Sequence, residues 1–272
     1  MAYPKPISRR SFLQTVLVVL AASAGLGGLR ARPAHADADM SVIGWSQWGQ
    51  PLTVHRLGNG PLHLFILGGQ HGGPEANTTE LAQMLMAHLS ENPGEIPANV
   101  TVDIMPEGNP DGLLTGSRQF ISGVDPNRNW ATPDWQSDAY DSYGRFRPGL
   151  GGTAPFSEQE TVALGNWLWG VWPKYTINYH SAGGFMFGGG EGLVGELSEL
   201  YSDASGYPRP TAGPGGGGSP LSYRATGNMN GWIRGVGMGG CLIELASATD
   251  PEFDRNLAGV QAVLARLGAE GR

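Results

Sequence analysis

The segment LHLFILGGQHGGPE, residues 62–75, decides the fold of this chain. Its apolar first half is typical of a buried strand, and the paired glycines indicate a turn that ends it. Apolar residues then recur at the spacing of one helix face over residues 81–89. His71 and Glu75 therefore lie between a strand and a helix, where open α/β sheets bind ligands. We predict that both bind zinc, with a third ligand further along the chain.

The remaining elements follow from the same patterns. Strands are predicted over residues 41–58 (a hairpin), 100–105, 175–179 and 241–245, and helices over 157–172, 226–234 and the stretch after residue 251. Residues 157–160 (SEQE) fit a capping box. Residues 113–156 read as loop, and the glycine-rich region 183–220 reads either as a flexible surface loop or as the mobile rim of a substrate cleft. The order β-β-α-β-α-β-α-β-α, without a repeat or a linker, predicts one α/β domain.

Composition excludes several classes of protein. The single cysteine, Cys241, excludes an intrachain disulfide. The net charge is −7, yet residues 1–36 contain basic residues and no acid, so the remainder of the chain is more acidic still. Nucleic-acid binding needs clustered lysine and arginine, and we therefore expect no nucleic-acid partner.

The first 36 residues have the features of an export signal. Residues 8–14 (SRRSFLQ) form a twin-arginine pattern, an apolar stretch follows to residue 29, and residues 34–36 (AHA) fit a cleavage site. The alternative is a membrane anchor, but the apolar stretch is short and broken by glycine. We predict a twin-arginine signal peptide over 1–36 and a catalytic domain over 37–272. The mature protein is then secreted or periplasmic, without stable membrane association.

Several chemically capable side chains fall at or near predicted strand ends. Catalytic zinc takes three protein ligands and leaves a position for water, and His71, Glu75 and His180 supply that number. Zinc lowers the pKa of its water from about 15.7 to about 7. Glu244 is the candidate for moving the proton, because an acid inside an apolar strand is costly without a task or a partner.

Each of these residues also has a structural interpretation. Either histidine could be a hydrogen-bonded core residue, and Glu75 could simply favour the first turn of a helix. Glu244 could be a buried ion-pair partner of Arg118 or Arg128. Their joint placement at strand ends favours a catalytic site.

Four motifs occur in an order and spacing that resemble a known family. They are residues 109–112 (NPDG), 123–130 (GVDPNRNW), 180–181 (HS) and 243–245 (IEL). Over residues 60–250 the chain resembles the M14 zinc carboxypeptidases, in particular the smaller bacterial branch that includes murein peptide amidases. The resemblance implies a three-layer α/β/α domain with a mixed central sheet.

The resemblance also implies a role for each matching residue. His71, Glu75 and His180 would bind one zinc per chain. Glu244 would act as general base and then as general acid. The remaining implied roles are as follows: Arg118 polarises the scissile carbonyl, Asn127 and Arg128 hold the terminal carboxylate of the substrate, and Asp125 orients His71.

The chain departs from the family pattern in two places. Three residues rather than two separate His71 from Glu75, and two of them are glycines that can absorb the additional length. The tyrosine that pancreatic-type members place after a Gly-x-x-x-Trp stretch is missing. Aligning Gly227 and Trp232 puts Arg234 at that position, where it could contact an anion or face solvent.

The leading hypothesis is a secreted zinc metallocarboxypeptidase, expected to be a monomer, that acts on a peptide or a peptidoglycan-derived substrate. A second hypothesis is a zinc amidohydrolase or deacylase of small N-acyl amino acids. A third is a catalytically inactive zinc-site protein that binds peptides or glycans.

Overall fold

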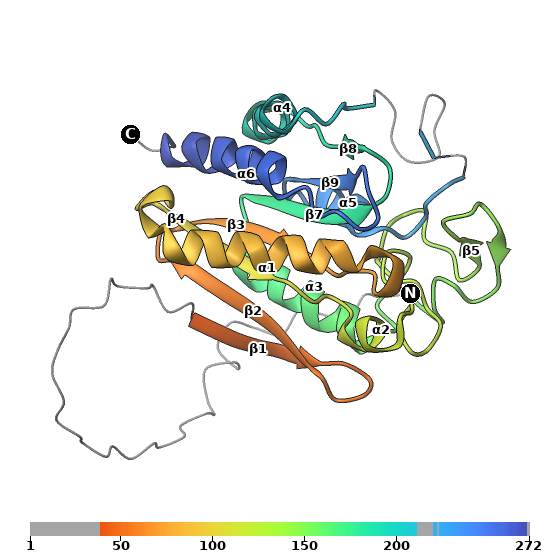
Figure 1. Cartoon of the computed structure of the whole chain (residues 1–272). Coiled ribbons are helices and arrows are strands. Elements are labelled where there is room, and N and C mark those ends of the chain that lie inside the picture. The colour runs from red at the N-terminus through yellow and green to blue at the C-terminus, as the bar shows by residue number, and fades with distance from the viewer. Residues whose placement is uncertain (1–38, 211–219, 222, 271–272) are drawn as a thin grey trace, which may run out of the picture. The chain divides into compact units, whose positions relative to one another are not determined.

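The computed structural model describes residues 39–210, 220–221 and 223–270 (Figure 1). The predicted signal peptide and residues 211–219 of the glycine-rich region lie outside these ranges. No helix among the described residues combines the length and the apolar composition that a membrane crossing needs.

A seven-stranded mixed sheet forms the middle layer of the fold. The strands that run parallel, β4, β3, β7 and β9, are flanked by antiparallel neighbours on both sides. This confirms the mixed sheet that the resemblance implied. In spatial order the strands are β1 (Asp39–Trp45), β2 (Pro51–Gly58), β4 (Val100–Met105), β3 (Leu62–Leu67), β7 (Tyr175–Ser181), β9 (Gly240–Leu245) and β8 (Phe185–Phe187).

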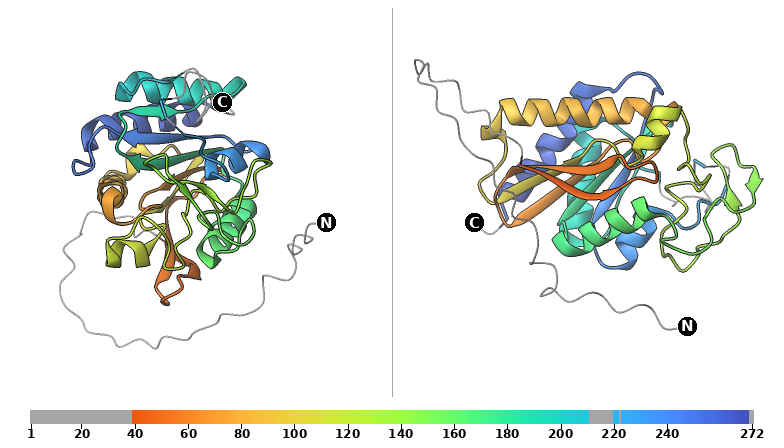
Figure 2. Two further views of the ribbon diagram at one scale, coloured as in Figure 1. Left: turned by 90° about the vertical axis from the view of Figure 1, so that its right-hand side faces the viewer. Right: turned by 90° about the horizontal axis from the view of Figure 1, so that it is seen from below.

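Helices cover both faces of this sheet, and each face has its own apolar core. One core packs α1, α4 and α6 against the sheet, and the other packs α3 and α5 against the opposite face. The right-hand view of Figure 2 shows α1 and α3 on opposite sides of the strands. The helices are α1 (Ala76–Glu91), α2 (Pro110–Thr115), α3 (Gln159–Val171), α4 (Gly192–Ser205), α5 (Met229–Gly235) and α6 (Phe253–Gly268).

The parallel strands are buried on both faces, and this explains their sequence. All six residues of β4 are buried, as are the first six of β7. Burial by helices on both sides accounts for the nearly continuous apolar run of β3. Strand β4 was predicted instead from its alternation of apolar residues with Thr101 and Asp103, and the structure buries these two polar residues as well. The same parallel arrangement places the carboxyl ends of β3, β7 and β9 at one edge of the sheet, where His71, His180 and Glu244 meet.

Two local expectations were wrong. The predicted capping box does not form, because α3 begins after Glu158 and has no side-chain cap. Ser157 Oγ instead donates to Glu158 Oε1 over 2.7 Å, and Glu160 Oε1 accepts a bond from Gln47 N over 2.9 Å. The Glu160 side chain is therefore used by the β1–β2 turn, and the Ser157 side chain is used by Glu158 and by Asn129, which donates to Ser157 Oγ over 2.9 Å.

The second concerns the glycine-rich region 183–220, which is not a continuous loop. It contains the edge strand β8 and the 14-residue helix α4. Leu197 and Tyr201, one helical turn apart, are fully buried on the side of α4 that packs against the core. The glycines on either side of α4 hid this short amphipathic pattern. Residues 113–156 are mostly loop as predicted; the end of α2 overlaps their first residues, and the small hairpin of β5 (Ala139–Tyr140) and β6 (Phe146–Arg147) is inserted.

Candidate active site

A tight turn absorbs the additional residue between His71 and Glu75. Residues Gly73–Glu75 form a 3₁₀ turn, η1, between β3 and α1. Gly73 has φ +54°, and a Cβ there would collide with the carbonyl oxygen of Gly116. A Cβ on Gly72 would likewise collide with the backbone of Gly112. The two glycines therefore allow the turn to press against the backbone around α2, and Glu75 points back to His71.

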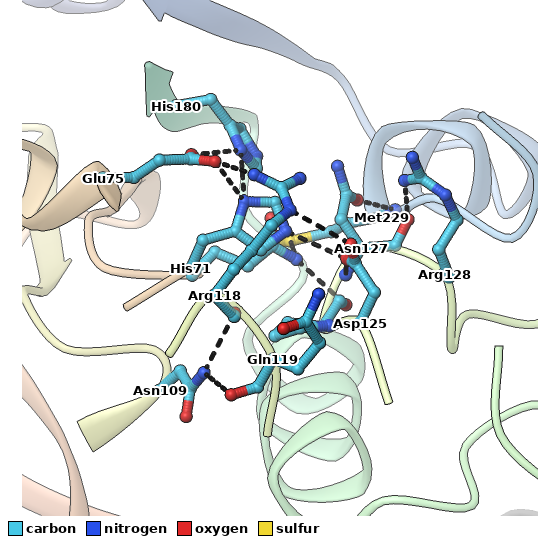
Figure 3. A network of polar contacts seen from close by, with 12 residues as sticks. His71, Glu75, Asn109, Arg118, Gln119, Asp125, Asn127, Arg128, His180 and Met229 are labelled. Carbon is cyan, nitrogen blue, oxygen red and sulfur yellow. Dashed lines mark hydrogen bonds and ion pairs between the residues drawn. The ribbon is translucent and has the colours of Figure 1, made fainter. Parts of the chain in front are cut away.

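His71, Glu75 and His180 converge in the interior (Figure 3). Their ligand atoms all lie within 4.8 Å of one another, and all three residues are buried. His71 Nδ1 lies 3.0 Å from Glu75 Oε1. His180 Nδ1 lies 3.1 Å from His71 Nδ1 and 3.1 Å from Glu75 Oε2. Two imidazoles and a carboxylate thus direct their donor atoms to one place.

The protonation of this cluster fits a bound cation. Asp125 Oδ1 lies 3.0 Å from His71 Nε2, so Nε2 carries the proton and Nδ1 presents a lone pair to the cluster. Burial, reinforced by Arg118, lowers the pKa of His71 to about 4. Burial, together with His71, holds the pKa of His180 well below its usual range. Neutral imidazoles and a carboxylate that face one another are a suitable ligand set for zinc.

Asp125 lies where the prediction of its orienting role requires. It is fully buried, which opposes ionisation, but Arg118 and His71 hold the pKa of its carboxyl well below the usual range. Its Oδ1 also accepts a bond from Asn127 N over 2.8 Å, and its Oδ2 accepts one from Arg118 Nε over 3.2 Å. One carboxylate therefore connects a predicted zinc ligand with the two chain segments predicted to bind substrate.

Arg118 lies between the metal ligands and the pocket. Its Nη1 pairs with Glu75 Oε1, and its Nε pairs with Asp125. The backbone of this loop is fixed by Asn109, whose Nδ2 donates to the carbonyl oxygens of Arg118 over 3.4 Å and of Gln119 over 3.1 Å (Figure 3). The guanidinium is consequently held at the mouth of the cluster rather than free to rotate.

Arg128 is a buried cation with an unused donor. Arg128 is only 2% exposed to solvent. Nε donates to Tyr140 O over 3.1 Å, and Nη1 donates to Asn127 O over 2.8 Å. Nη2 is buried and has no partner among the described residues. An unpaired buried guanidinium is costly, so this nitrogen indicates where an anionic ligand group would bind.

Glu244 lies beside His180 on the neighbouring strand, with which it is in register. Burial raises the pKa of its carboxyl, while Arg118 and His71 act in the opposite direction. Within the described ranges, Glu244 forms no ion pair with Arg118 or Arg128. The ion-pair interpretation of Glu244 is therefore wrong for this structure.

One pocket brings six of the predicted site residues together, whereas His71, Glu75 and Asp125 are not part of its lining. Its lining includes the predicted residues Arg118, Asn127, Arg128, His180, Arg234 and Glu244. Other residues of the lining were not predicted as site residues from the sequence, among them Phe187, Leu221, Tyr223, Asn228, Asn230 and Leu242.

Tyr223 is the most informative of the residues that the sequence did not reveal. Its ring centroid lies 5.7 Å from Arg128 Cζ, and burial raises the pKa of its hydroxyl. The family pattern places a tyrosine after the segment from Gly227 to Trp232, whereas Tyr223 precedes that segment. The sequence feature that could have indicated Tyr223 is its position as an aromatic residue between the glycine-rich region and the start of α5.

This combination of fold and metal-ligand cluster defines a zinc-dependent hydrolase. The model of the zinc carboxypeptidase family matches residues 34–189, and the chain belongs to this family. The matched range contains His71, Glu75 and His180, and Glu244 lies beyond it.

Comparison with solved structures supports the fold. Murein-tripeptide amidase MpaA from Escherichia coli O157 is 22% identical, with a TM-score of 0.63 over 87% of this chain and 93% of that one. Bovine thrombin-activatable fibrinolysis inhibitor, in complex with tick carboxypeptidase inhibitor, is 21% identical, with a TM-score of 0.67 over 86% and 90%. Carboxypeptidase A from Helicoverpa armigera is 15% identical, with a TM-score of 0.64 over 86% and 69%.

A curated sequence also matches. Bacteriocin BCN5 from Clostridium perfringens is 26% identical over 246 residues, which are 82% of this chain and 24% of the bacteriocin. The chain thus spans about a quarter of the length of that relative.

Proposed function

We propose that this chain is an exported zinc metallocarboxypeptidase that hydrolyses an amide bond next to a free carboxylate. The observation that carries the proposal is the convergence of the His71–Glu75–His180 cluster with Glu244, which lacks an ion-pair partner among the described residues, and with the unused donor of Arg128. A proton carrier and an anion site in one pocket, beside a metal-ligand set of which His180 lines that pocket, are the parts that this reaction needs.

The residues have complementary tasks in this mechanism. Zinc bound by His71, Glu75 and His180 would supply Lewis acidity and activate water. Glu244 takes a proton as the oxygen of water bonds to the carbonyl carbon. It returns that proton to the nitrogen as the C–N bond breaks. Arg118 stabilises the negative charge that develops on the carbonyl oxygen.

The substrate is positioned by its terminal carboxylate. Arg128 is suited to this task because its Nη2 is buried without a partner in the described structure, and Asn127 lines the same pocket. Asn127 is itself fixed, since its Oδ1 accepts a bond from Met229 N over 2.9 Å. We propose cell-wall peptides as the natural substrate. The twin-arginine pattern of residues 8–14 supports export, and one structural neighbour is a murein-tripeptide amidase.

The test compares substrates and one variant. The zinc-loaded protein is assayed against N-blocked dipeptides, murein-derived peptides and N-acyl amino acids. Glu244→Gln should keep its zinc and lose about 10²–10⁴-fold in kcat. Glu91→Gln, an exposed acid on α1, is the matched control. Wild-type hydrolysis by zinc-bound Glu244→Gln would refute the role of Glu244. Cleavage of N-acyl amino acids alone would favour a deacylase, and no cleavage with zinc bound would favour a binding protein.

Export has a separate test. Replacing Arg9 and Arg10 by lysine should retain the full-length precursor in the cytoplasm of a host with a twin-arginine system, whereas the unchanged chain is exported and shortened. Cell fractionation with immunodetection distinguishes the two forms. Equal export of both proteins would refute the proposed route.

A further inference from the structure

We propose, on the basis of the proposed function, that the pocket selects a terminal residue whose side chain ends in a carboxylate, and that Arg234 recognises this second carboxylate. The lining contains the three arginines Arg118, Arg128 and Arg234 but one carboxylate, that of Glu244. Because Arg118 is compensated by carboxylates outside the lining, Arg128 and Arg234 against Glu244 leave the pocket cationic, although the chain as a whole carries a net charge of −7.

The three arginines are not equivalent. Arg118 already pairs with the carboxylates of Glu75 and Asp125. Arg128 is buried and held by two carbonyl oxygens, which leaves Nη2 for the terminal carboxylate of the substrate. Arg234 is exposed, and its guanidinium has no ion-pair or hydrogen-bond partner in the described part of the chain. Arg234 is consequently a second anion site that the terminal carboxylate does not require.

The helix that carries Arg234 is firmly attached to the site. Asn228 caps α5 by accepting a bond from Gly231 N over 2.7 Å. The same end of α5 is tied to the substrate loop by the bond from Met229 N to Asn127 Oδ1. Arg234 is thus presented to the pocket by the helix that is fixed to the neighbour of Arg128.

Asn230 adds a second donor on the same helix. Asn230 and Arg234 are four residues apart, so they lie on one face of α5, and both line the pocket. Asn230 Oδ1 lies 3.5 Å from Asn178 Nδ2, which is the donor of that contact. The Nδ2 group of Asn230 therefore remains available to donate to a ligand. A side chain with oxygen acceptors matches this pair better than one with donors.

The apolar part of the lining fits the same class of side chain. Phe187 and Leu242 line the pocket together with the polar groups. They can pack against the methylene groups of a glutamate-like side chain while its carboxylate contacts Arg234. A lysine side chain would bring a second cation to Arg234, and a leucine side chain would leave the donors of Asn230 unused. The geometry thus favours an acidic terminal residue over a basic or an apolar one.

The experiment measures kcat/KM for N-blocked dipeptides that differ in the last residue: Glu, Gln, Leu and Lys. Glu and Gln form the matched pair, because they differ in charge and hardly in shape. The wild-type enzyme should prefer Glu to Gln by about tenfold or more, mainly through KM, as expected for a charge-assisted contact. Arg234→Gln should reduce that ratio towards one, and Arg234→Glu should shift the preference towards Lys.

Arg224→Gln is the control variant, and two outcomes distinguish failure of this inference from failure of the proposed function. Arg224→Gln removes a neighbouring arginine that pairs with Asp134 over 3.6 Å and does not line the pocket, so the Glu-to-Gln ratio should stay at its wild-type value. Zinc content and thermal unfolding confirm that each variant is folded. If peptides are cleaved but Gln or Leu equals Glu, or if Arg234→Gln leaves the ratio unchanged, this inference is overturned. If no peptide is cleaved, the proposed function itself fails.

Discussion

Replacing Gly73 by alanine tests whether the turn before Glu75 is built around the absence of a side chain. Gly73 has φ +54°, in the left-handed region, and a Cβ there would meet the carbonyl oxygen of Gly116. The left-handed conformation alone costs an alanine about 1–2 kcal/mol. The collision adds to that cost because the obstructing atom belongs to the backbone and cannot rotate away. Glu75, two residues along, would move with the turn.

Substitutions at two other glycines separate the cost of the left-handed conformation from the cost of the collision. Gly149 has φ +70° with nothing within 4 Å of the position that a Cβ would take, so Gly149→Ala reports the conformational cost alone. Gly72 has φ −82°, and a Cβ there meets the backbone of Gly112, so Gly72→Ala reports a collision without the left-handed cost. We expect Gly149→Ala to lose about 1–2 kcal/mol of unfolding free energy and to keep its zinc affinity. Gly73→Ala should lose more.

The assay has two readouts. Urea unfolding of the metal-free proteins in excess chelator gives the free energy of unfolding, and competition with a chromogenic chelator gives the zinc affinity. For Gly73→Ala we expect the zinc affinity to fall by about 10–100-fold, as it does when the support of a ligand is disturbed. If Gly73→Ala matches Gly149→Ala in both readouts, the collision does not matter and the account of the turn is wrong.

Three further predictions concern side chains that support the site or the fold. Asp125→Asn should lower zinc affinity by about 10–100-fold, because it removes the charge that orients His71. Competition with a chelator measures the affinity, and an unchanged value would contradict the orienting role of Asp125. Glu160→Gln should stabilise the protein at pH 7 and have less effect at pH 4. Burial raises the pKa of Glu160, so the folded state disfavours the charged carboxylate that forms as pH rises, and glutamine removes that cost. The midpoints of urea unfolding at the two pH values test the sign of this effect. The Asn77 side chain accepts a bond from Ser181 Oγ over 2.8 Å and donates to Ser247 O over 2.8 Å, so it joins α1 to the segments at the ends of β7 and β9. Asn77→Ala should therefore lower zinc affinity and kcat more than it changes KM. A change confined to KM would refute this.

The predictable part of the fold is the part in which local sequence and tertiary environment agree. Strand β3 is an apolar run that is largely buried on both faces, so its sequence reports the strand directly. Strands β4 and β7 alternate apolar and polar residues, a pattern that also predicts a strand although the structure buries both kinds. Helix α4 was missed because its buried positions lie within a glycine-rich region, where composition suggested a loop. Its partner α6, which has the same kind of apolar face but lies outside the glycine-rich region, was predicted correctly.

The site was predictable to the extent that it depends on strand ends. Each of His71, His180 and Glu244 belongs to a segment that the sequence identified, and parallel pairing brings those segments together. The sequence could not show which carboxylates Arg118 would pair with, since Glu75 and Asp125 reach it from different loops. Tyr223 was missed for a related reason: its relation to Arg128 is a contact between segments almost a hundred residues apart.

The charge of the whole chain and the charge of its pocket lead to different conclusions about partners. A net charge of −7 argues against nucleic acid, whose binding depends on many phosphates meeting an extended basic surface. It does not argue against a small anionic substrate, because exposed charges are largely screened beyond about 8 Å at physiological ionic strength. Arg128 and Arg234 line the pocket, so a ligand bound there would lie closer to them than to the acids of the surface. Under the proposed function these two guanidinium groups would decide which ligand binds, and the acidic surface would influence the rate at which an anionic peptide arrives.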